Sequence, residues 1–239
     1  MCGRFTMALD AERLQMKLDL ASMPEPWAKR YNIAPSQYIP TVPFAESRHV
    51  VYMRWGLVPF WAQDPAIGNR MINARAETVA EKPSFRSSFK NKRCLILADG
   101  FYEWQKASGG KSSQPYYFTL KTREPFAFAG LWDDWEPKGV SSEPGIPGLT
   151  TCTLITTTAN RVVAPVHPRM PVILTKERMW DWLTAKTETE KLALLKPLEP
   201  ELMQAWPVGR EVNSPAIDDE SLIHPIDAMN QSIKQEQLL

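Results

Sequence analysis

The chain has 239 residues, of which 44% are hydrophobic and 23% are charged. This composition is typical of a globular protein and excludes wholesale disorder. No apolar run approaches the roughly 20 residues that a membrane-spanning helix needs. Three scattered cysteines are too few for a disulfide framework, and the N-terminus lacks an apolar signal core. We therefore expect a protein of the cytoplasm, or of the nucleus if its source is eukaryotic.

The net charge of +1 does not by itself indicate a nucleic-acid-binding protein, but the charge is unevenly distributed. From Glu211 onward there are six acidic residues and one lysine, which leaves +6 on the first 210 residues. Residues 81–93 carry a local charge of +4. A basic face of this kind suits an anionic partner, although a solvated helix face is the commoner explanation of a single basic run.

In the first half of the chain, residues 9–20 and 81–90 have helical patterns, the second with Pro83 in its first turn. Residues 31–43 are proline-rich and should be extended. Short apolar runs bounded by turn residues predict strands along much of the chain. These runs are residues 49–57, 94–98, 101–106, 116–122, 125–132, 151–157 and 172–174.

Two further helices are expected after the strands, at residues 176–183 and 187–196. Thr187 and Glu190 have the spacing of a capping box at the start of the second. The Gly/Ser-rich residues 107–113 and 137–148 should be surface loops. Strands outnumber helices without regular alternation, so we predict an α+β protein: one domain, with a curled, largely antiparallel sheet and peripheral helices.

Cys2 is the first residue that could carry chemistry. Removal of Met1 would leave an N-terminal cysteine, which has a free amine and a thiol on adjacent carbons. This pair condenses with an aldehyde: the amine forms a Schiff base, the thiol adds to it, and a thiazolidine ring results. An incidental terminal cysteine is the plainer explanation, but Phe5 can anchor this end in the core and so present Cys2.

Two other segments contain candidate acid–base groups. Glu103 lies among aromatic residues in a predicted strand, where partial burial would suit it to proton transfer; alternation along that strand equally allows a solvent-facing residue. His167 lies in a loop held by two prolines, beside Arg169. Such a histidine could act as an acid or base near neutral pH, or could simply be a turn residue.

A fourth segment combines polar and aromatic residues. Asn73 could orient a carbonyl or hydroxyl group, and Arg75 could bind phosphate. Trp55 and Trp61 lie upstream and could stack on bases; burial in the core is the alternative, and we expect it for Trp55. Cys94, in an apolar run, should be inert core. The sequence contains no phosphate-binding loop, dinucleotide fingerprint or zinc-ligand spacing, so we expect neither cofactor nor metal.

Six motifs, taken together and in this order, resemble those of the SRAP family, named for SOS response-associated peptidase. They are CGRF at 2–5, RYNIAP at 30–35, WGLVP at 55–59, NARAET at 73–78, ADGFYEW at 98–104 and HPRMP at 167–171. The resemblance covers residues 2–226, which we interpret as an SRAP domain, and leaves residues 227–239 as a disordered tail. It implies a single α+β domain that senses abasic sites in single-stranded DNA.

The resemblance also implies roles for individual residues. Cys2 would be the nucleophile that crosslinks to the abasic site, and Asn73 would position the reacting sugar. Glu103 would shuttle protons during Schiff-base formation, and His167 would help to open the deoxyribose ring. The residues expected to contact DNA are Arg4, Pro35, Trp61, Arg75, Thr156 and Arg169. We expect a monomer whose partner is abasic single-stranded DNA, with no membrane partner.

Two other functions fit the same residues. A thiol peptidase would use Cys2 as nucleophile, His167 as base and Glu103 to orient the histidine, and would not need a free amine. A single-strand DNA-binding module would bind in a salt-sensitive manner, without preference for abasic sites and without a covalent product.

Overall fold

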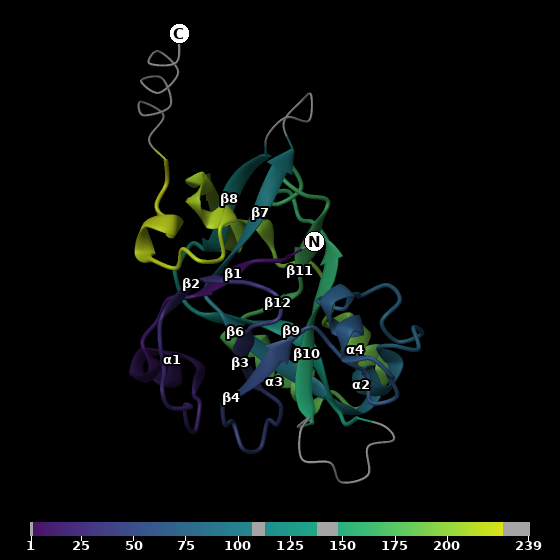
Figure 1. The fold of residues 1–239 in the computed structure, drawn as a ribbon. Coiled ribbons are helices and arrows are strands. Elements are labelled where there is room, and N and C mark those ends of the chain that lie inside the picture. Colours follow the sequence, from purple (N-terminus) through teal and green to yellow (C-terminus); the bar gives the residue numbers. More distant parts are fainter. Residues whose placement is uncertain (1, 107–112, 138–147, 227–239) are drawn as a thin grey trace.

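The computed structural model describes residues 2–106, 113–137 and 148–226, and within them the chain forms two sheets flanked by helices (Figure 1). The first sheet has five strands in the order β13-β8-β7-β1-β2. Their bounds are β13 Met203–Pro207, β8 Ser113–Leu120, β7 Gly100–Lys106, β1 Phe5–Met7 and β2 Arg30–Ile33. Neighbouring strands in this sheet all pair antiparallel.

The second sheet closes on itself. Its order is β11-β10-β4-β3-β6-β9-β12, and β10 also pairs with β9, which joins five of the strands into a ring. The bounds are β11 Arg169–Pro171, β10 Leu149–Thr158, β4 Val51–Trp55, β3 Tyr38–Val42, β6 Arg93–Ala98, β9 Phe126–Trp135 and β12 Ile173–Leu174. A short strand, β5 (Asn73–Arg75), pairs with β10. The pairings of β10 with β4 and with β5 are parallel; the other pairings are antiparallel.

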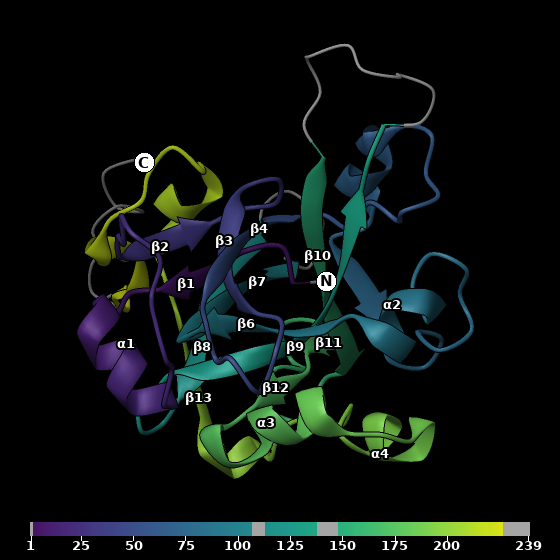
Figure 2. The same cartoon turned by 90° about the horizontal axis from the view of Figure 1, so that it is seen from below.

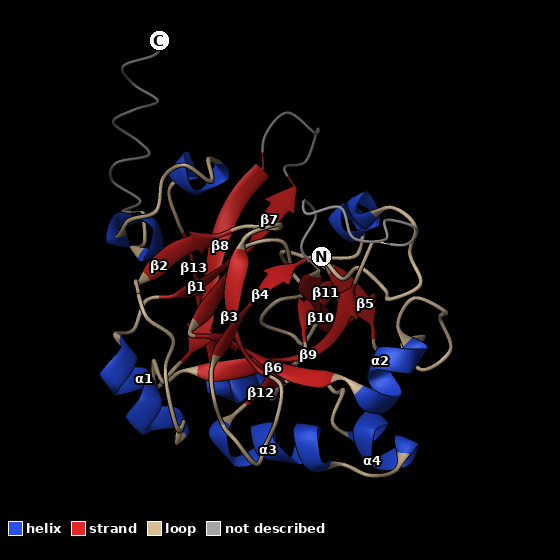
Figure 3. Ribbon diagram, turned by 60° about the horizontal axis from the view of Figure 1, so that its bottom comes forward, coloured by secondary structure: helices blue, strands red, loops and turns tan. Residues whose placement is uncertain are grey.

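Helices surround the sheets, with α1 on one side and α2 and α4 on the other (Figures 2 and 3). The α-helices described are α1 Ala11–Leu18, α2 Arg86–Asn91, α3 Lys176–Thr184 and α4 Glu188–Ala193, and 3-10 helices lie at Pro65–Arg70, Pro200–Leu202, Arg210–Asn213 and Glu220–Ile223. The predicted capping box of Thr187 and Glu190 starts α4. No helix in the described ranges is long and apolar enough to cross a bilayer.

The core lies between the two sheets, and Phe5 is fixed in it. This side chain is completely buried and makes edge contacts with Trp55 and Phe128, with ring centroids 5.3 and 5.6 Å apart. Such aromatic pairs stabilise a core beyond the area that they bury. The expected anchoring of the N-terminal segment by Phe5, and the expected burial of Trp55 and Cys94, are therefore confirmed.

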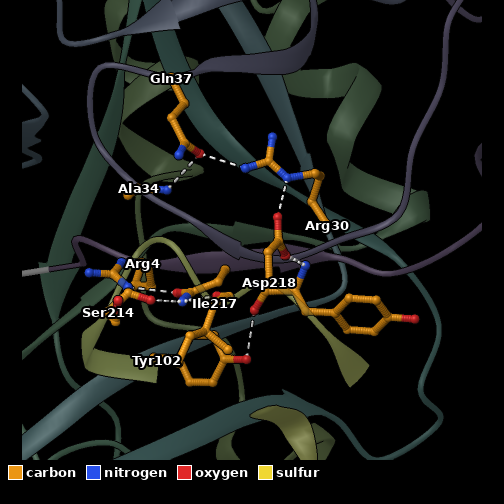
Figure 4. A network of polar contacts seen from close by, with 10 residues as sticks. Arg4, Arg30, Ala34, Gln37, Tyr102, Ser214, Ile217 and Asp218 are labelled. Carbon is orange, nitrogen blue, oxygen red and sulfur yellow. Dashed lines mark hydrogen bonds and ion pairs between the residues drawn. The ribbon is translucent and has the colours of Figure 1, made fainter. Parts of the chain in front are cut away.

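A C-terminal segment, residues 210–218, is held against β2 by a polar network (Figure 4). Asp218 accepts hydrogen bonds from the guanidinium of Arg30 and, at 2.5 Å, from the backbone N–H of Tyr31. The fully buried Asn32 donates to the carbonyls of Ser214 and Ile217 at 2.9 and 2.6 Å. Two segments far apart in the sequence are thereby joined, and both accept hydrogen bonds from Arg4.

The predicted α+β class and the single, largely antiparallel domain are confirmed, with several differences of detail. The helix expected at residues 81–90 begins only at Arg86, because residues 77–85 form successive turns, so Pro83 precedes the helix. The sequence patterns did not predict the short strands β1, β5, β11 and β13, each of five residues or fewer. The loops expected at 107–113 and 137–148, and the tail at 227–239, fall largely or wholly outside the described residues.

Replacing Asn32 should loosen the link between β2 and the C-terminal segment. In Asn32→Ala the partly buried carbonyls of Ser214 and Ile217 lose the amide that donates to them, so we expect the free energy of unfolding to fall by about 1–3 kcal/mol. Chemical denaturation would measure it. The control is Asn91→Ala on the exposed end of α2, which should change stability by less than about 0.5 kcal/mol. Equal effects of the two substitutions would contradict the proposed link.

Candidate active site

The register of the first sheet brings Cys2 to Glu103. Strands β1 and β7 run antiparallel with Phe5 opposite Phe101, and the N–H of Tyr102 donates to the carbonyl of Arg4 at 3.0 Å. Continuing this pairing toward the N-terminus places Gly3 opposite Glu103, so Cys2 follows within one residue of that position. The Glu103 carboxylate is close enough to the Cys2 thiol for its charge to raise the thiol pKa. The Cys2 thiol, completely buried, lies 3.8 Å from the carbonyl oxygen of Arg4.

Glu103 is buried, with 3% of its surface exposed. The interpretation of Glu103 as a solvent-facing strand residue is therefore wrong. Burial raises the pKa of its carboxyl group above the ordinary glutamate value, and His167 partly offsets the shift. A carboxyl group of this kind exchanges protons closer to neutral pH than an exposed glutamate does.

His167 faces this carboxyl group. Its Nδ1 lies 3.9 Å from Oε1 of Glu103 and accepts a hydrogen bond from the N–H of Arg169 at 3.0 Å. The accepted bond favours the neutral tautomer that carries its proton on Nε2. The carbonyl oxygen of Arg169 lies 3.1 Å from the same Nδ1, so a protonated ring has an acceptor there. His167 therefore lies in the turn before β11, with its ring held by the backbone of Arg169.

Asn73 connects the second sheet to the N-terminus. It begins β5, and its Nδ2 donates to the carbonyl oxygen of Cys2 at 2.8 Å. Its Oδ1 is buried and has no hydrogen-bond donor among the described residues. A buried acceptor without a donor is costly in a folded protein. Asn73 thus holds Cys2 with one end of its amide and presents an open acceptor with the other.

The thiol of Cys2 is not a ready thiolate. Burial raises its pKa far above the ordinary cysteine value, and the neighbouring carboxylate of Glu103 raises it further. Reactive thiolates in enzymes instead have lowered pKa values beside positive charge. At neutral pH the Cys2 thiol is therefore protonated, and any attack by its sulfur requires a nearby group to take the proton.

Arg169 is held by protein groups. Its guanidinium forms a two-pronged ion pair with Glu77, with N–O distances of 2.6 and 3.0 Å. It also donates to the carbonyl of Thr156 at 2.6 Å. Thr156 itself is completely buried in β10, with its hydroxyl directed at the carbonyl of Ala74 at 3.3 Å. These contacts place Arg169 and Thr156 at the wall of the site.

The other four residues expected to contact DNA differ in how exposed they are. Arg4 points inward, and its Nη1 donates to Asn32 Oδ1 and to the carbonyl of Val212, both at 2.6 Å. Arg75 is exposed, and Trp61 retains 39% of its surface. Pro35 is partly exposed in the turn between β2 and β3. Their contacts with DNA stay predictions.

The structure therefore brings Cys2, Asn73, Glu103 and His167 together, from segments spread over most of the chain. Sequence reasoning missed two supporting residues, Asn32 and Glu77. Both lie inside motifs that the sequence had singled out, but their roles depend on partners more than 90 residues away. Within the described ranges there is no cluster of three or more His, Cys, Asp or Glu side chains that could hold a metal ion.

Comparison with known proteins agrees with this geometry. The family model described as SOS response associated peptidase (SRAP) matches residues 1–215. The chain belongs to the SRAP family. The match supports the SRAP assignment made from the six motifs and covers every residue of the candidate site.

Curated relatives of this SRAP chain carry a common name. Abasic site processing protein YoqW of Bacillus subtilis (strain 168) is 42% identical over 228 residues, covering 93% of this chain and 99% of the relative. Abasic site processing protein HMCES of Gallus gallus is 34% identical over 274 residues, covering 95% of this chain and 78% of the relative. A crystal structure of a Bacteroides thetaiotaomicron protein superposes with a TM-score of 0.82 at 28% identity, covering 95% of this chain and all of that one.

The ion pair at the wall of the SRAP site should contribute a small, pH-dependent stability. The hydrogen bond from Arg169 lowers the pKa of Glu77, so its contribution is present above the ordinary glutamate pKa and is lost as the pH falls through the lowered value. Because the Glu77 side chain is 48% exposed, we expect Glu77→Gln to cost only about 0.5–1 kcal/mol at neutral pH. Unfolding measured against pH should show this difference vanish in acid; a difference that persists there would exclude the ionic explanation.

Proposed function

We propose that this SRAP protein processes abasic sites by binding single-stranded DNA and forming a covalent crosslink through Cys2, as part of a DNA damage response. The main observation behind the proposal is that Cys2, which becomes N-terminal when Met1 is removed, lies close to Asn73, Glu103 and His167. The names of the curated relatives support the substrate. Removal of Met1 is required, because only a free α-amine can condense with an aldehyde.

The reaction balances without a cofactor. The open-chain form of an abasic deoxyribose carries an aldehyde; the Cys2 amine adds to it and water leaves, giving a Schiff base. The thiol then adds to the same carbon, its sulfur forming the new bond while the nitrogen gains a proton. Aldehyde and aminothiol thus give a thiazolidine and one water. Closure of the ring removes the Schiff base that strand cleavage by β-elimination would need.

The surrounding groups fit the proton transfers that this sequence demands. The protonated thiol of Cys2 must lose a proton before its sulfur can attack, and ionised Glu103 is the base beside it. His167 can donate to the ring oxygen of the sugar, which opens the ring and exposes the aldehyde. The unused Oδ1 of Asn73 can accept a hydrogen bond from a sugar hydroxyl. Each role is one that a general acid, a general base or an orienting amide performs in enzymes.

The protonated state of Cys2 favours this chemistry over that of a thiol peptidase. A peptidase nucleophile needs a lowered thiol pKa and a histidine directed at it. Here burial raises the thiol pKa, and Nδ1 of His167 is directed at Glu103 and the Arg169 backbone. The aminothiol reaction does not need a thiol that is already ionised, since the amine attacks first.

Removing the thiol should abolish the covalent product. We expect wild-type protein that has lost Met1, incubated with abasic single-stranded DNA, to give a heat-stable shifted band on a denaturing gel. Cys2→Ala should give none, because no ring can close and the Schiff base reverses. Cys152→Ala is the matched control, a second buried cysteine, and should retain the band. A peptidase would instead require activity on peptides, and a simple binding module would give no band from any variant.

Glu103→Gln should slow crosslinking by about a hundredfold, because a positioned base typically contributes that much or more. In the wild type, the rate should fall as the pH decreases through the raised pKa of Glu103, since only the ionised carboxylate accepts a proton. The glutamine variant should lack this decrease. Single-turnover gel assays over a pH series measure both effects, with Glu46→Gln on the surface as control. Identical pH profiles for Glu103→Gln and wild type would remove Glu103 from the mechanism.

A further inference from the structure

The segment that carries His167 is a turn held in place by a few hydrogen bonds. We define the His167 turn as residues 159–168, which connect β10 to β11. Its two ends are joined by a hydrogen bond from the N–H of Ala159 to the carbonyl of Pro168 at 3.0 Å, and residues 161–166 form successive turns. Such a segment lacks the continuous pairing of a strand, so individual hydrogen bonds decide where His167 lies.

Asn160 holds the inside of the His167 turn. Its side chain is buried, and its Oδ1 accepts hydrogen bonds from the backbone N–H groups of Val162 and Val163, both at 3.1 Å. The carbonyl of Val163 in turn accepts the N–H of His167 at 2.9 Å. An asparagine oxygen that accepts from N–H groups two and three residues ahead is the arrangement that starts a local turn. Two successive hydrogen bonds therefore connect the Asn160 side chain to the backbone of His167.

The nitrogen of the same amide ties the turn to a distant part of the chain. Nδ2 of Asn160 donates to the carbonyl of Leu198 at 2.8 Å, in a buried position. The oxygen and the nitrogen of this side chain are thus both occupied. A buried polar group whose hydrogen bonds are all made rigidifies its surroundings. The His167 turn is therefore fixed against the core and not only closed upon itself.

Gln105 holds the tip of the His167 turn. It lies two residues after Glu103 in β7, so the two side chains leave the strand on the same face. Nε2 of Gln105 donates to the carbonyl of Pro165 at 3.0 Å, and Nδ1 of His167 lies 3.9 Å from Oε1 of Glu103. One face of β7 thus carries both the buried carboxyl group and a hydrogen bond to the turn whose histidine faces that group.

We propose that Asn160 and Gln105 are positioning residues for His167, which hold its imidazole at the place from which it donates a proton to the ring oxygen of the abasic sugar. This inference rests on the proposed function, because it concerns the histidine that would open the deoxyribose ring. The two residues act through geometry, since an amide side chain is neither an acid nor a base near neutral pH. Both lie outside the six motifs by which the sequence resembles the SRAP family.

The first test compares two aldehydes in single-turnover crosslinking at saturating DNA. One is an abasic site, whose sugar ring must open before it reacts. The other is an oligonucleotide with an acyclic aldehyde in place of the sugar, which has no ring to open. Asn160→Ala should slow crosslinking to the abasic site about tenfold and Gln105→Ala about threefold, because displacing a reacting group by about 1 Å can cost up to a hundredfold. Both variants should crosslink to the acyclic aldehyde at the rate of the unaltered protein.

Two further variants separate positioning by Asn160 from general damage to the site. Asn160→Asp keeps the oxygen that accepts the two backbone N–H groups, and should recover most of the rate that Asn160→Ala loses. In the His167→Ala background, Asn160→Ala should have no further effect on the abasic site, because the histidine that it positions is gone. Equal slowing on the two aldehydes, or additive losses in the double variant, would overturn the proposal.

The matched control for Gln105 is the glutamine opposite it on the neighbouring strand. Gln114 pairs with Gln105 across β7 and β8, and its Nε2 donates to the carbonyl of Val208, outside the His167 turn. Gln114→Ala should leave both crosslinking rates unchanged. The bond from Gln105 lies at the surface, so Gln105→Ala should keep the melting temperature of the unaltered protein. It tests the same geometry without the loss of a buried group. Equal slowing by the two glutamine substitutions would contradict the proposal.

The position of His167 can also be measured without any reaction. The chain has three histidines, so the ring-nitrogen NMR signals of His167 can be assigned by their loss in His167→Ala. Asn160→Ala and Gln105→Ala should shift these signals, and Gln114→Ala should not. Unshifted signals in both variants would overturn this inference whatever the crosslinking assay gives. Absence of any crosslink from the unaltered protein would instead contradict the proposed function, so the two failures are distinguishable.

Discussion

The candidate site depends on the anchoring of the N-terminal strand. A chain terminus normally frays, and a nucleophile on a frayed end would sample many positions. Here Phe5 is buried between the sheets, and the Thr6 hydroxyl donates to the buried carboxyl of Asp99 at 2.5 Å. The N–H of Ala8 donates to the other oxygen of Asp99 at 2.7 Å. These contacts hold the three-residue strand β1, and the residue after it, in a fixed position, and so fix Cys2 near Glu103.

Burial gives this arrangement its chemistry as well as its rigidity. The pKa values of Cys2, Glu103 and Asp99 are all raised, chiefly because burial disfavours the charged forms. Asp99 accepts the hydrogen bonds from Thr6 and Ala8 and so has a structural role in holding β1. Glu103 lies beside the thiol, where a carboxyl group that exchanges protons nearer neutrality can give and take protons in turn. The same low-polarity surroundings keep the thiol protonated, which is compatible with the proposed aminothiol reaction because the amine attacks first.

The sequence predicted features that arise from local pattern and missed those that arise from distant partners. Apolar runs identified the long strands, and spacing identified the capping box of α4. By contrast, Arg4 looks like a surface cation in the sequence, yet it bonds to the carbonyl of Val212, 208 residues away. Glu103 alternates with aromatic residues as an exposed strand residue would. Glu103 is buried because the N-terminal segment and the His167 turn cover it. Neither of these neighbours can be predicted from the sequence of β7 alone.

The arginines of the family motifs therefore divide into two kinds, which constrains how DNA could be held. Arg4 and Arg169 already donate to protein oxygens, and withdrawing them to bind phosphate would leave buried carbonyls and Glu77 without donors. They are better suited to shaping the site. Arg75 and the cations around α2 are exposed and cost little to redirect. Affinity for a strand would then come mainly from cations outside the reacting centre, so salt would weaken binding while leaving the geometry around Cys2 intact.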